Sequence, residues 1–489
     1  MTVKKQAATL GELKKSGYQS KSVKNEIRDN LILKLKSGEP VFDGVLGYED
    51  TVIPQVERAI LAGHNINFLG LRGQAKTRMA RKMVGLLDEF IPIVAGSEIN
   101  DDPLRPLSRK SIQLIEKLGD KTPIEWIHRD TRYTEKLATP DVNVADLIGD
   151  IDPIKAANLK LSFSDEEVIH FGLIPRSNRG IFVINELPDL QPRIQVSLFN
   201  ILQEGDIQIR GFKLRFPLDV QFLFTANPED YTNRGAIITP LKDRIQSQIF
   251  THYPQSPEIG MEITRQEAKI SETQKKIVVP YLIERLVEQI AQEARVSEFV
   301  DEKSGVSARL SISALESVVS AVERRMLINN EKTGTARISD LNASVPAIVG
   351  KIEMVYEGEQ EGASSVAHKL IGAAIRTLSS NYFPGIENVQ KKNAVNAKEK
   401  FAPIIAFFED GNNVDLGHDV SAKDYEKELK KIKGLKETVE SLTVADGEGI
   451  TLLMEFLLHA LAEYSLLDRK VGLKGYKFQD YFSSIIGGI

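Results

Sequence analysis

Residues 66–77, INFLGLRGQAKT, decide the fold that we expect for this chain. The apolar run from Ile66 to Leu69 is short enough to be a buried strand, and the glycine-containing loop after it ends in Lys76 and Thr77. Apolar residues then recur at helical spacing: Met79, Ala80, Met83, Val84 and Leu87. A strand, a glycine-containing loop and a helix in this order predict a phosphate-binding loop, because the N–H groups at a helix N-terminus bind anions.

The loop supplies the candidate residues for nucleotide binding: Gly70, Arg72, Gly73, Gln74, Ala75, Lys76, Thr77 and Arg78. In such a loop the lysine reaches the β- and γ-phosphates and the neighbouring hydroxyl ligates Mg²⁺, which assigns these roles to Lys76 and Thr77. The usual motif has glycine where this chain has Ala75. That difference matters only if the position needs a positive φ, which would cost about 1 kcal/mol or more.

Further short apolar runs follow, separated by amphipathic helices, from about Pro40 to Pro254. The runs are Ile124 to Ile127, Ile181 to Ile184 and Val220 to Thr225. Together with the first strand they predict a parallel sheet that helices cover on both faces.

Two of these predicted strands end in polar residues. Asn185 and Glu186 follow the run that starts at Ile181, and Asn227 follows the run that starts at Val220. Because open α/β sheets bind ligands at the carboxyl ends of their strands, we expect these side chains at the same edge as the loop. Glu186 is therefore a candidate to polarise an attacking water.

The order of these motifs closely resembles the AAA+ ATPases, specifically the branch that contains the magnesium-chelatase I subunit and the MoxR-type ATPases. The resemblance covers about Pro40 to Met354. Three further segments carry it: VLGYE at 45–49, INDDP at 99–103 and NRGI at 178–181.

The resemblance implies a role for each matching residue in the first half of the chain. Lys76 and Thr77 would be the Walker A ligands, Glu186 the Walker B base that orients water, and Asn227 the sensor 1 residue. These groups act electrostatically on the transferred phosphoryl group. Walker B normally has an aspartate before its glutamate, and this chain has Asn185. We expect Thr77 and Asn185 to face the metal and the lost charge to weaken metal binding, while Glu186 still acts as the base.

Two arginines also match the family. Arg244 matches the arginine finger that reaches the γ-phosphate of a neighbouring subunit, although it is also a helix-terminal arginine beside Asp243. Arg309 matches the sensor 2 arginine at the start of a lid helix, although a serine two residues before a helix is also an ordinary capping sequence. With Glu186 and Asn227, they complete the expected catalytic set.

The expected fold class is α/β: a P-loop AAA+ parallel sheet with helices on both faces, followed by a helical lid and an all-α C-terminal extension. Four regions follow from the pattern: an N-terminal helical arm (1–40), the nucleotide-binding domain (41–255), the lid (256–354) and a mainly helical extension of unknown role (355–489). The glycine- and glutamate-rich stretch 356–365 looks like a linker.

Composition excludes several classes of function. The chain of 489 residues has no cysteine, so thiolate metal sites and cysteine nucleophiles are ruled out. Its net charge of -5 offers no general attraction to nucleic acid or anionic lipid. The N-terminal sequence lacks the apolar segment of a signal peptide, so we expect a cytoplasmic protein without membrane insertion.

Two surface segments suggest interactions. Residues 206–216 predict a hairpin whose basic side chains, Arg210, Lys213 and Arg215, either face a central pore or form an ordinary solvated face. The segment Pro140 to Pro175 lies where the family carries its helix 2 insert, which either couples nucleotide state to a partner or is a passive loop.

We therefore expect an AAA+ ATPase that binds ATP and Mg²⁺ between the subunits of a ring, expected to be a hexamer. Its hydrolysis would drive remodelling, or metal insertion and maturation, of a partner protein, with a von Willebrand A-domain protein as companion. Two alternatives stay open: a nucleotide-gated scaffold with little or no hydrolysis, and a nucleic-acid translocase that uses the basic hairpin. The client is not named by the sequence.

Overall fold

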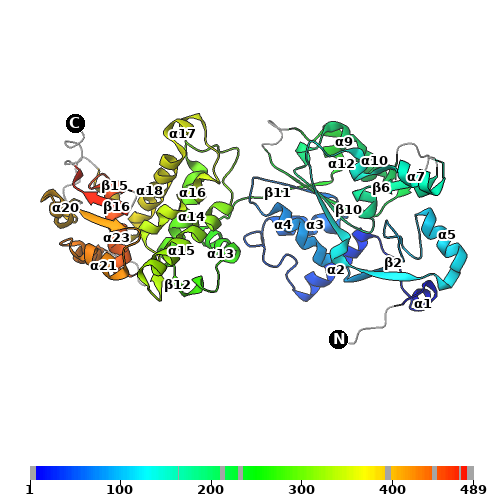
Figure 1. The fold of residues 1–489 in the computed structure, drawn as a ribbon, viewed down its shortest axis with the longest axis horizontal. Helices are drawn as coiled ribbons and strands as arrows, with labels where there is room; N and C mark the ends of the chain where they lie inside the picture. The colour runs from blue at the N-terminus through cyan, green and yellow to red at the C-terminus, as the bar shows by residue number, and fades with distance from the viewer. Residues whose placement is uncertain are drawn as a thin grey trace. The chain divides into compact units, whose positions relative to one another are not determined.

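The computed structural model describes residues 7–162, 165–209, 215–228, 235–390, 398–442, 449–472 and 475–481. The chain forms two compact units, Met1–His252 and Tyr253–Ile489, each of which is described by itself (Figure 1). Within the described ranges, no helix has both the length and the apolar character needed to cross a membrane.

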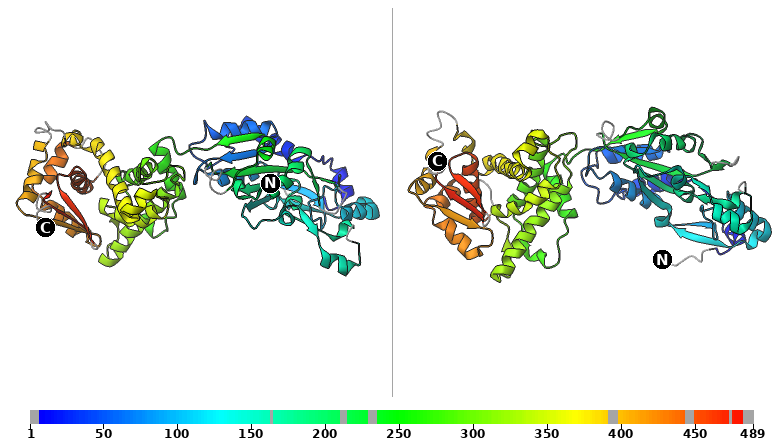
Figure 2. Two further views of the ribbon diagram at one scale, coloured as in Figure 1. Left: turned by 90° about the horizontal axis from the view of Figure 1, so that it is seen from above. Right: turned by 45° about the horizontal axis from the view of Figure 1, so that its top comes forward.

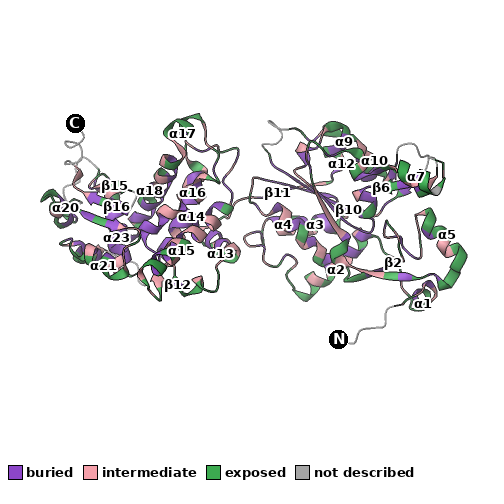
Figure 3. Ribbon diagram, in the orientation of Figure 1, coloured by how far each residue is buried: buried purple, intermediate pink, exposed green. Residues whose placement is uncertain are grey.

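The first unit is built on a five-stranded parallel sheet with the order β11-β1-β10-β7-β4. The strands are β1 (Ile66–Leu69), β4 (Tyr133–Leu137), β7 (Gly180–Asn185), β10 (Val220–Ala226) and β11 (Ser247–Phe250). All residues of β1 and β10 are buried (Figure 3). The predicted parallel sheet is confirmed, and its three central strands are those that the apolar runs indicate.

The two edge strands differ from the sequence expectation. The run Ile124 to Ile127 was expected in the sheet, but it belongs to β3 (Ile124–His128), which pairs antiparallel with β2 (Phe90–Val94). The edges are instead β4 and β11, with the mixed sequences YTEKL and SQIF. Edge strands contact a neighbour on one side only and carry polar residues, so a search for apolar runs misses them.

Helices cover both faces of the sheet. On one face, α2 (Val23–Ser37), α3 (Val52–Leu61) and α4 (Lys76–Lys82) share a core with Ile66 and Phe68 of β1; the blue helices of this group lie along the sheet in the left view of Figure 2. On the other face, α9 (Pro192–Ser197) and α10 (Phe199–Glu204) share a core with Leu69. Successive strand side chains point to opposite faces, which explains why one short strand serves both cores.

The N-terminal segment packs into this unit. Val23, Ile27 and Leu31 of α2 are buried, and their four-residue spacing puts them on one face of the helix. On the same helix, Glu26 accepts two hydrogen bonds of 2.7 Å from the buried guanidinium of Arg132. The helix is therefore tied to the sheet by both apolar contacts and a buried ion pair.

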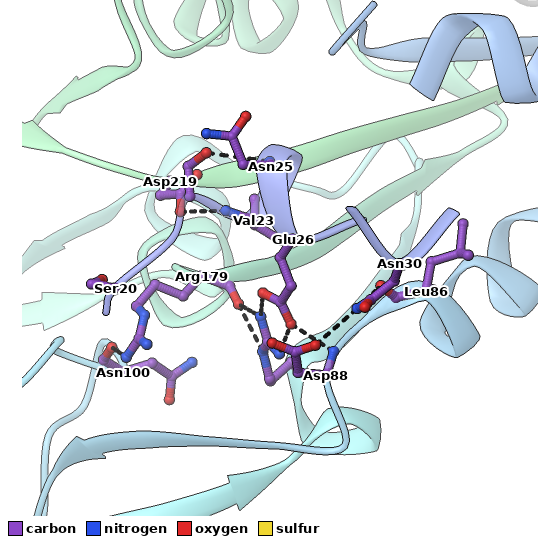
Figure 4. A network of polar contacts seen from close by, with 12 residues as sticks. Ser20, Val23, Asn25, Glu26, Asn30, Leu86, Asp88, Asn100, Arg179 and Asp219 are labelled. Atoms are coloured by element: carbon purple, nitrogen blue, oxygen red, sulfur yellow. Dashed lines mark hydrogen bonds and ion pairs between the residues drawn. The ribbon is translucent and has the colours of Figure 1, made fainter. Parts of the chain in front are cut away.

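Around this ion pair, a polar network holds the start of β7 (Figure 4). Arg132 also donates from Nε and Nη2 to the carbonyl of Arg179, at 2.8 and 2.6 Å. Arg179 has a φ of 59°. The Asn178 amide donates to the Ile99 carbonyl at 3.0 Å, and the Asn100 amide donates to the Asn178 carbonyl at 3.1 Å. The NRGI and INDDP segments, which are far apart in sequence, therefore fix each other at the N-terminal end of β7.

The segment between β4 and β7 forms a small substructure. It contains α6 (Val144–Leu147), β5 (Gly149–Ile151), α7 (Pro153–Leu159) and β6 (Ile169–Phe171), with β5 and β6 paired antiparallel. After α10, β8 (Asp206–Gln208) and β9 (Arg215–Pro217) pair antiparallel as the predicted hairpin.

The second unit is mainly helical and has one continuous hydrophobic core from Ile277 to Phe478. Its helices are α13 (Pro257–Glu267), α14 (Tyr281–Val296), α15 (Arg309–Asn329), α16 (Val345–Val349), α17 (Tyr356–Glu361), α18 (Ala363–Tyr382), α20 (Ala402–Glu409), α21 (Ala422–Lys430), α22 (Leu435–Leu442) and α23 (Ile450–Glu463). The proposed boundary at 354 falls within this shared core and stays a prediction.

Two details of this unit correct the sequence expectation. The extension is helical as expected but not all-α, because β14 (Val414–Gly417), β15 (Asp468–Gly472) and β16 (Gly475–Gln479) form an antiparallel sheet. The stretch 356–365 is not a linker but α17 and the start of α18. Its Gly358 is a packing residue, since a Cβ there would lie 2.4 Å from the Phe299 carbonyl oxygen.

Candidate functional site

The phosphate loop lies between β1 and α4, at the carboxyl edge of the sheet. Gly70 stands where no side chain fits, because a Cβ would lie 2.0 Å from the Thr251 hydroxyl and 2.3 Å from the Gln74 side-chain oxygen. Gly73 has a φ of 76° and Ala75 a φ of 54°. Ala75 therefore occupies the left-handed conformation that glycine usually adopts in this motif, at a cost of about 1 kcal/mol.

Lys76 links the loop to the neighbouring strands. Its ammonium group is mostly buried and donates to the carbonyls of Gly70 and Leu71, the latter at 2.8 Å. It also donates to Asn227 Oδ1 at 2.7 Å, and Asn227 Nδ2 in turn donates to Glu186 Oε2 at 2.9 Å. The predicted Walker A lysine, sensor 1 amide and Walker B glutamate therefore form one continuous chain of contacts.

The sheet topology explains this chain of contacts. Lys76 follows β1, Asn227 follows β10 and Glu186 follows β7, and these are adjacent parallel strands whose carboxyl ends meet at one edge. Glu186 has a φ of 56°, and its backbone N–H donates to the Thr225 hydroxyl at 3.1 Å. A left-handed non-glycine residue at a strand end is typical of functional sites.

Thr77 and Asn185 face each other beside this chain. The Thr77 hydroxyl donates to Asn185 Oδ1 at 3.4 Å, and the Thr225 hydroxyl donates to the same oxygen at 3.2 Å. Hydroxyl and amide oxygens are acceptable ligands for a hard cation, so the residues present fit Mg²⁺. In the part of the chain that the structure describes, no cluster of three or more carboxylate or imidazole groups offers another metal site.

Residues outside the motif support the loop. The Thr251 hydroxyl donates to Gln74 Oε1 at 2.8 Å, and the Tyr48 hydroxyl lies within 3.0 Å of the Gln74 carbonyl and 2.9 Å of the His252 carbonyl. Burial raises the pKa of Tyr48 to about 12. Sequence reasoning did not single out Thr225 or Thr251, and the only signal for them is that each lies at the end of a strand.

The remaining loop residues lie close to this centre. Arg72 is half-buried in the loop between the two glycines, and Arg78 is half-buried on the first turn of α4. Both make interactions within the protein.

The arginine-finger candidate, Arg244, is the last residue of α12 (Thr239–Arg244). It donates to Gln203 Oε1 at 3.0 Å and to the Pro240 carbonyl at 2.7 Å, and it lies 4.8 Å from the centre of the Phe199 ring. The contacts with Gln203 and Phe199 hold Arg244 against α10. None of these three contacts is with the phosphate loop of the same chain.

The sensor 2 candidate, Arg309, begins α15 in the second unit, where it is exposed. Its backbone N–H donates to the Ser307 hydroxyl at 3.1 Å. The structure brings together Lys76, Thr77, Asn185, Glu186 and Asn227 within the first unit, while the role of Arg309, a residue of the second unit, stays a prediction.

The basic hairpin is described only in part. Arg210 and Lys213 lie outside the described residues. Arg215 is exposed on β9 and lies 3.4 Å from Asp206 Oδ2. In the described part of the hairpin, Asp206 partly neutralises the charge of Arg215. This part of the hairpin therefore gives no support to the translocase alternative.

Comparison with known proteins shows what the chain is similar to. Residues 123–245 match the AAA domain of the dynein-related subfamily. The magnesium-chelatase 38 kDa subunit of Cereibacter sphaeroides is 25% identical over 232 residues, which are 46% of this chain and 63% of that protein. The same subunit of Rhodobacter capsulatus is 24% identical over 228 residues, 46% of this chain and 59% of that protein. The chain thus spans less than two thirds of the length of these relatives.

Among solved structures, a chain of the complex between subunits BchI and BchD of magnesium chelatase is 18% identical and covers 65% of this chain and 98% of its own length, with a TM-score of 0.35. That score is too low to carry weight, so the assignment depends on the domain match, the two chelatase relatives and the P-loop α/β fold. Residues 123–245 thus match an AAA domain, and the chain is similar to the magnesium-chelatase 38 kDa subunits of these two organisms.

Proposed function

We propose that this protein binds ATP with Mg²⁺ at the loop and hydrolyses it to drive remodelling, or metal insertion and maturation, of a partner protein. The observation that supports this proposal most strongly is the chain of contacts Lys76, Asn227 and Glu186. It places a cation, a neutral donor and a carboxylate around the position that a helix N-terminus offers to a phosphate. This is the set of groups that phosphoryl transfer to water requires.

Nucleotide binding requires Lys76 to exchange partners. A lysine ammonium has three N–H donors, and here Gly70, Leu71 and Asn227 each accept one. A β- or γ-phosphate oxygen is a stronger acceptor than a carbonyl, because the hydrogen bond is then between two charged groups. We expect the phosphates to replace the carbonyl contacts with Gly70 and Leu71 while the lysine stays at the strand edge.

Asn227 links nucleotide binding to the base. Its Nδ2 donates to Glu186 Oε2, and the same amide group is the donor that a γ-phosphate oxygen would meet. If Asn227 turns to the phosphate, the Glu186 carboxylate loses this donor and becomes available to accept a proton from the attacking water. The contact therefore keeps the base occupied until a phosphate arrives.

Thr77 and Asn185 would hold Mg²⁺ through their side-chain oxygens. When bound, this ion neutralises charge on the phosphate oxygens. Mg²⁺ usually keeps several waters and binds few protein ligands, so a neutral amide can contribute to its coordination. With one carboxylate fewer than usual, we expect weaker metal binding and slower turnover.

The proposal includes a ring, expected to be a hexamer, in which Arg244 acts on the nucleotide of a neighbouring subunit and Arg309 acts as sensor 2. A von Willebrand A-domain companion, a protein client and a cytoplasmic location belong to the same proposal. The relatives in this branch, named as magnesium-chelatase subunits, support it. Literal magnesium chelation is one form that the maturation activity can take.

The test is steady-state phosphate release by the full chain, compared with Glu186→Gln. Glu204→Gln is a matched control, because Glu204 is an exposed acid at the end of α10. We expect Glu186→Gln to lower the rate at least about 100-fold, in the range for a lost general base, and Glu204→Gln to leave it unchanged. Equal rates for the native protein and Glu186→Gln would overturn the proposed hydrolysis. The slowed variant should also retain the client longest in a pull-down.

One observation favours a second candidate, the nucleotide-gated scaffold. The Asn185 amide lies 3.4 Å from the Thr77 hydroxyl, at the position where the family carries a carboxylate. A protein that binds ATP and assembles without turnover would show tight nucleotide binding and phosphate release no faster than Glu186→Gln. Under this alternative, Asn185→Asp would raise phosphate release in an otherwise inactive chain.

A further inference from the structure

The Asn185 side chain can face Thr77 in two ways that differ in chemistry. Its Oδ1 is an acceptor that can ligate a cation, whereas its Nδ2 carries two donor hydrogens that repel one. Half a turn about the last side-chain bond exchanges the two groups with almost no change in shape. A carboxylate would present an oxygen in both cases. The amide therefore needs a neighbour that fixes its orientation.

The Thr225 hydroxyl is placed to be this neighbour. Thr225 is 1% exposed, and its hydroxyl lies 3.2 Å from Asn185 Oδ1 and 3.1 Å from the Glu186 backbone nitrogen. In the register of β10 and β7, Phe224 pairs with Ile184. The next residues along these parallel strands are Thr225 and Asn185, so the two side chains meet at the carboxyl edge of the sheet.

The donors and acceptors around this hydroxyl fix the direction of each hydrogen bond. A backbone N–H only donates, so Glu186 occupies a lone pair of the Thr225 oxygen. In the part of the chain that the structure describes, the hydroxyl has one other partner, Asn185, and its hydrogen finds an acceptor there only if Oδ1 faces it. With the amide reversed, a buried O–H group would have no acceptor, which costs free energy.

Thr77 contacts the same oxygen but does not select the orientation. Its hydroxyl lies 3.4 Å from Asn185 Oδ1. A hydroxyl that can rotate either donates to an amide oxygen or accepts from an amide nitrogen, so Thr77 fits both orientations. Thr225 fits only one of them, because Glu186 already donates to its oxygen.

We propose that Thr225 is a positioning residue, whose hydroxyl turns the Asn185 amide so that the oxygen faces Thr77 and the position proposed for Mg²⁺. This inference rests on the proposed function, because it assigns the amide oxygen to the metal. Thr225 thereby gives a neutral amide the property that a carboxylate has by symmetry, an oxygen directed at the cation. A carboxylate at position 185 would not need Thr225 for this purpose.

Neutron diffraction from crystals of the deuterated full chain tests the orientation without nucleotide or metal. We expect a deuterium on Thr225 Oγ1 that points to Asn185 Oδ1, and the two amide deuteriums on the side of Asn185 away from Thr225. A deuterium on the amide nitrogen that points to Thr225 would overturn the proposal. This result does not depend on hydrolysis, so it is separate from any failure of the proposed ATPase.

Titration of Mg²⁺ into the full chain with a fluorescent ADP analogue tests the consequence without turnover. Thr225→Val keeps the branched shape and removes the hydroxyl. We expect the Mg²⁺ concentration at half-saturation to rise at least about twofold, because two equally populated orientations halve the fraction that is competent to bind. Thr225→Ser keeps the hydroxyl and should match the native protein. Urea unfolding followed by Trp126 fluorescence checks that each variant is folded.

Asn185→Asp provides the matched background. In it, Thr225→Val should leave the half-saturating Mg²⁺ concentration unchanged, since either carboxylate oxygen can face the metal. An equal rise in both backgrounds would show a general structural role, and it would overturn the proposal, as would no rise in the native Asn185 background. A native protein that binds no nucleotide would refute the proposed function instead, and the deuterium positions would still decide the orientation of the amide.

Discussion

Removal of the Glu26 carboxylate tests how strongly the N-terminal helix is tied to the nucleotide-binding sheet. The Arg132 side chain is 0% exposed and that of Glu26 is 5% exposed. Each of two guanidinium nitrogens donates to a different carboxylate oxygen at 2.7 Å, and the Asp88 backbone N–H donates to Glu26 Oε1 at 2.7 Å. Glu26→Gln keeps the shape but leaves the Arg132 charge buried without a counter-charge. Loss of one partner of a buried pair costs about 3–5 kcal/mol, so we expect about 3 kcal/mol or more.

Urea unfolding followed by tryptophan fluorescence is the assay. The chain has a single tryptophan, Trp126, which lies on β3 in the first unit, so its signal reports on the unit that contains the ion pair. This matters because a chain of two units need not unfold in one step. The control is Asp29→Asn, which removes the exposed Lys21–Asp29 pair from the same helix and should cost no more than about 1 kcal/mol.

If Glu26→Gln shifts the Trp126 transition no more than Asp29→Asn, the buried pair does not hold the helix and the reasoning is wrong. A double variant, Glu26→Leu with Arg132→Met, sharpens the test. It removes both charges, so its loss of unfolding free energy should be smaller than the sum of the losses of the two single variants. Full recovery is not expected, because Arg132 also donates to the Arg179 carbonyl.

Three further outcomes are expected. Ala75→Gly removes the strain of an alanine in the left-handed conformation, but it also gives the unfolded chain more conformational freedom. The free energy of unfolding followed by Trp126 should therefore increase by no more than about 1 kcal/mol, and a clear decrease would show that Ala75 is not strained. Asn185→Asp should lower the Mg²⁺ concentration needed for phosphate release, and an unchanged Mg²⁺ dependence would show that Asn185 does not face the metal. In the second unit, burial by itself raises the pKa of Glu455, but contacts with His459, Tyr425 and Ser339 outweigh it and lower the pKa from 4.5 to about 2. Stability from Glu455 is therefore present above pH 4.5 and is lost as the pH falls toward 2. Glu455→Gln should flatten this acid dependence when unfolding is followed by circular dichroism.

Much of the site can be predicted from local sequence, because its main residues each follow a strand that the sequence indicates. The runs that begin at Ile66, Ile181 and Val220 are apolar enough to predict central strands, and parallel topology then places Lys76, Glu186 and Asn227 at one edge. The edge strands could not be found in this way, since they are exposed on one side and tolerate polar residues. The supporting hydroxyls of Thr225 and Thr251 could not be picked out, because their only local signal is a place at a strand end, and a threonine there is ordinary in any sheet.

The sequence by itself determined the phosphate loop, the central strands and the identity of the groups at their ends, because spacing and hydrophobic periodicity are local properties of the chain. Only the tertiary structure decided which of these groups touch. The contact of Lys76 with Asn227 joins residues 151 positions apart, and the pair of Glu26 with Arg132 joins residues 106 positions apart. The positive φ of Ala75 and the contact of Thr225 with Asn185 are likewise tertiary results. Such features depend on how distant segments fill the same space, and no periodicity in the sequence records that.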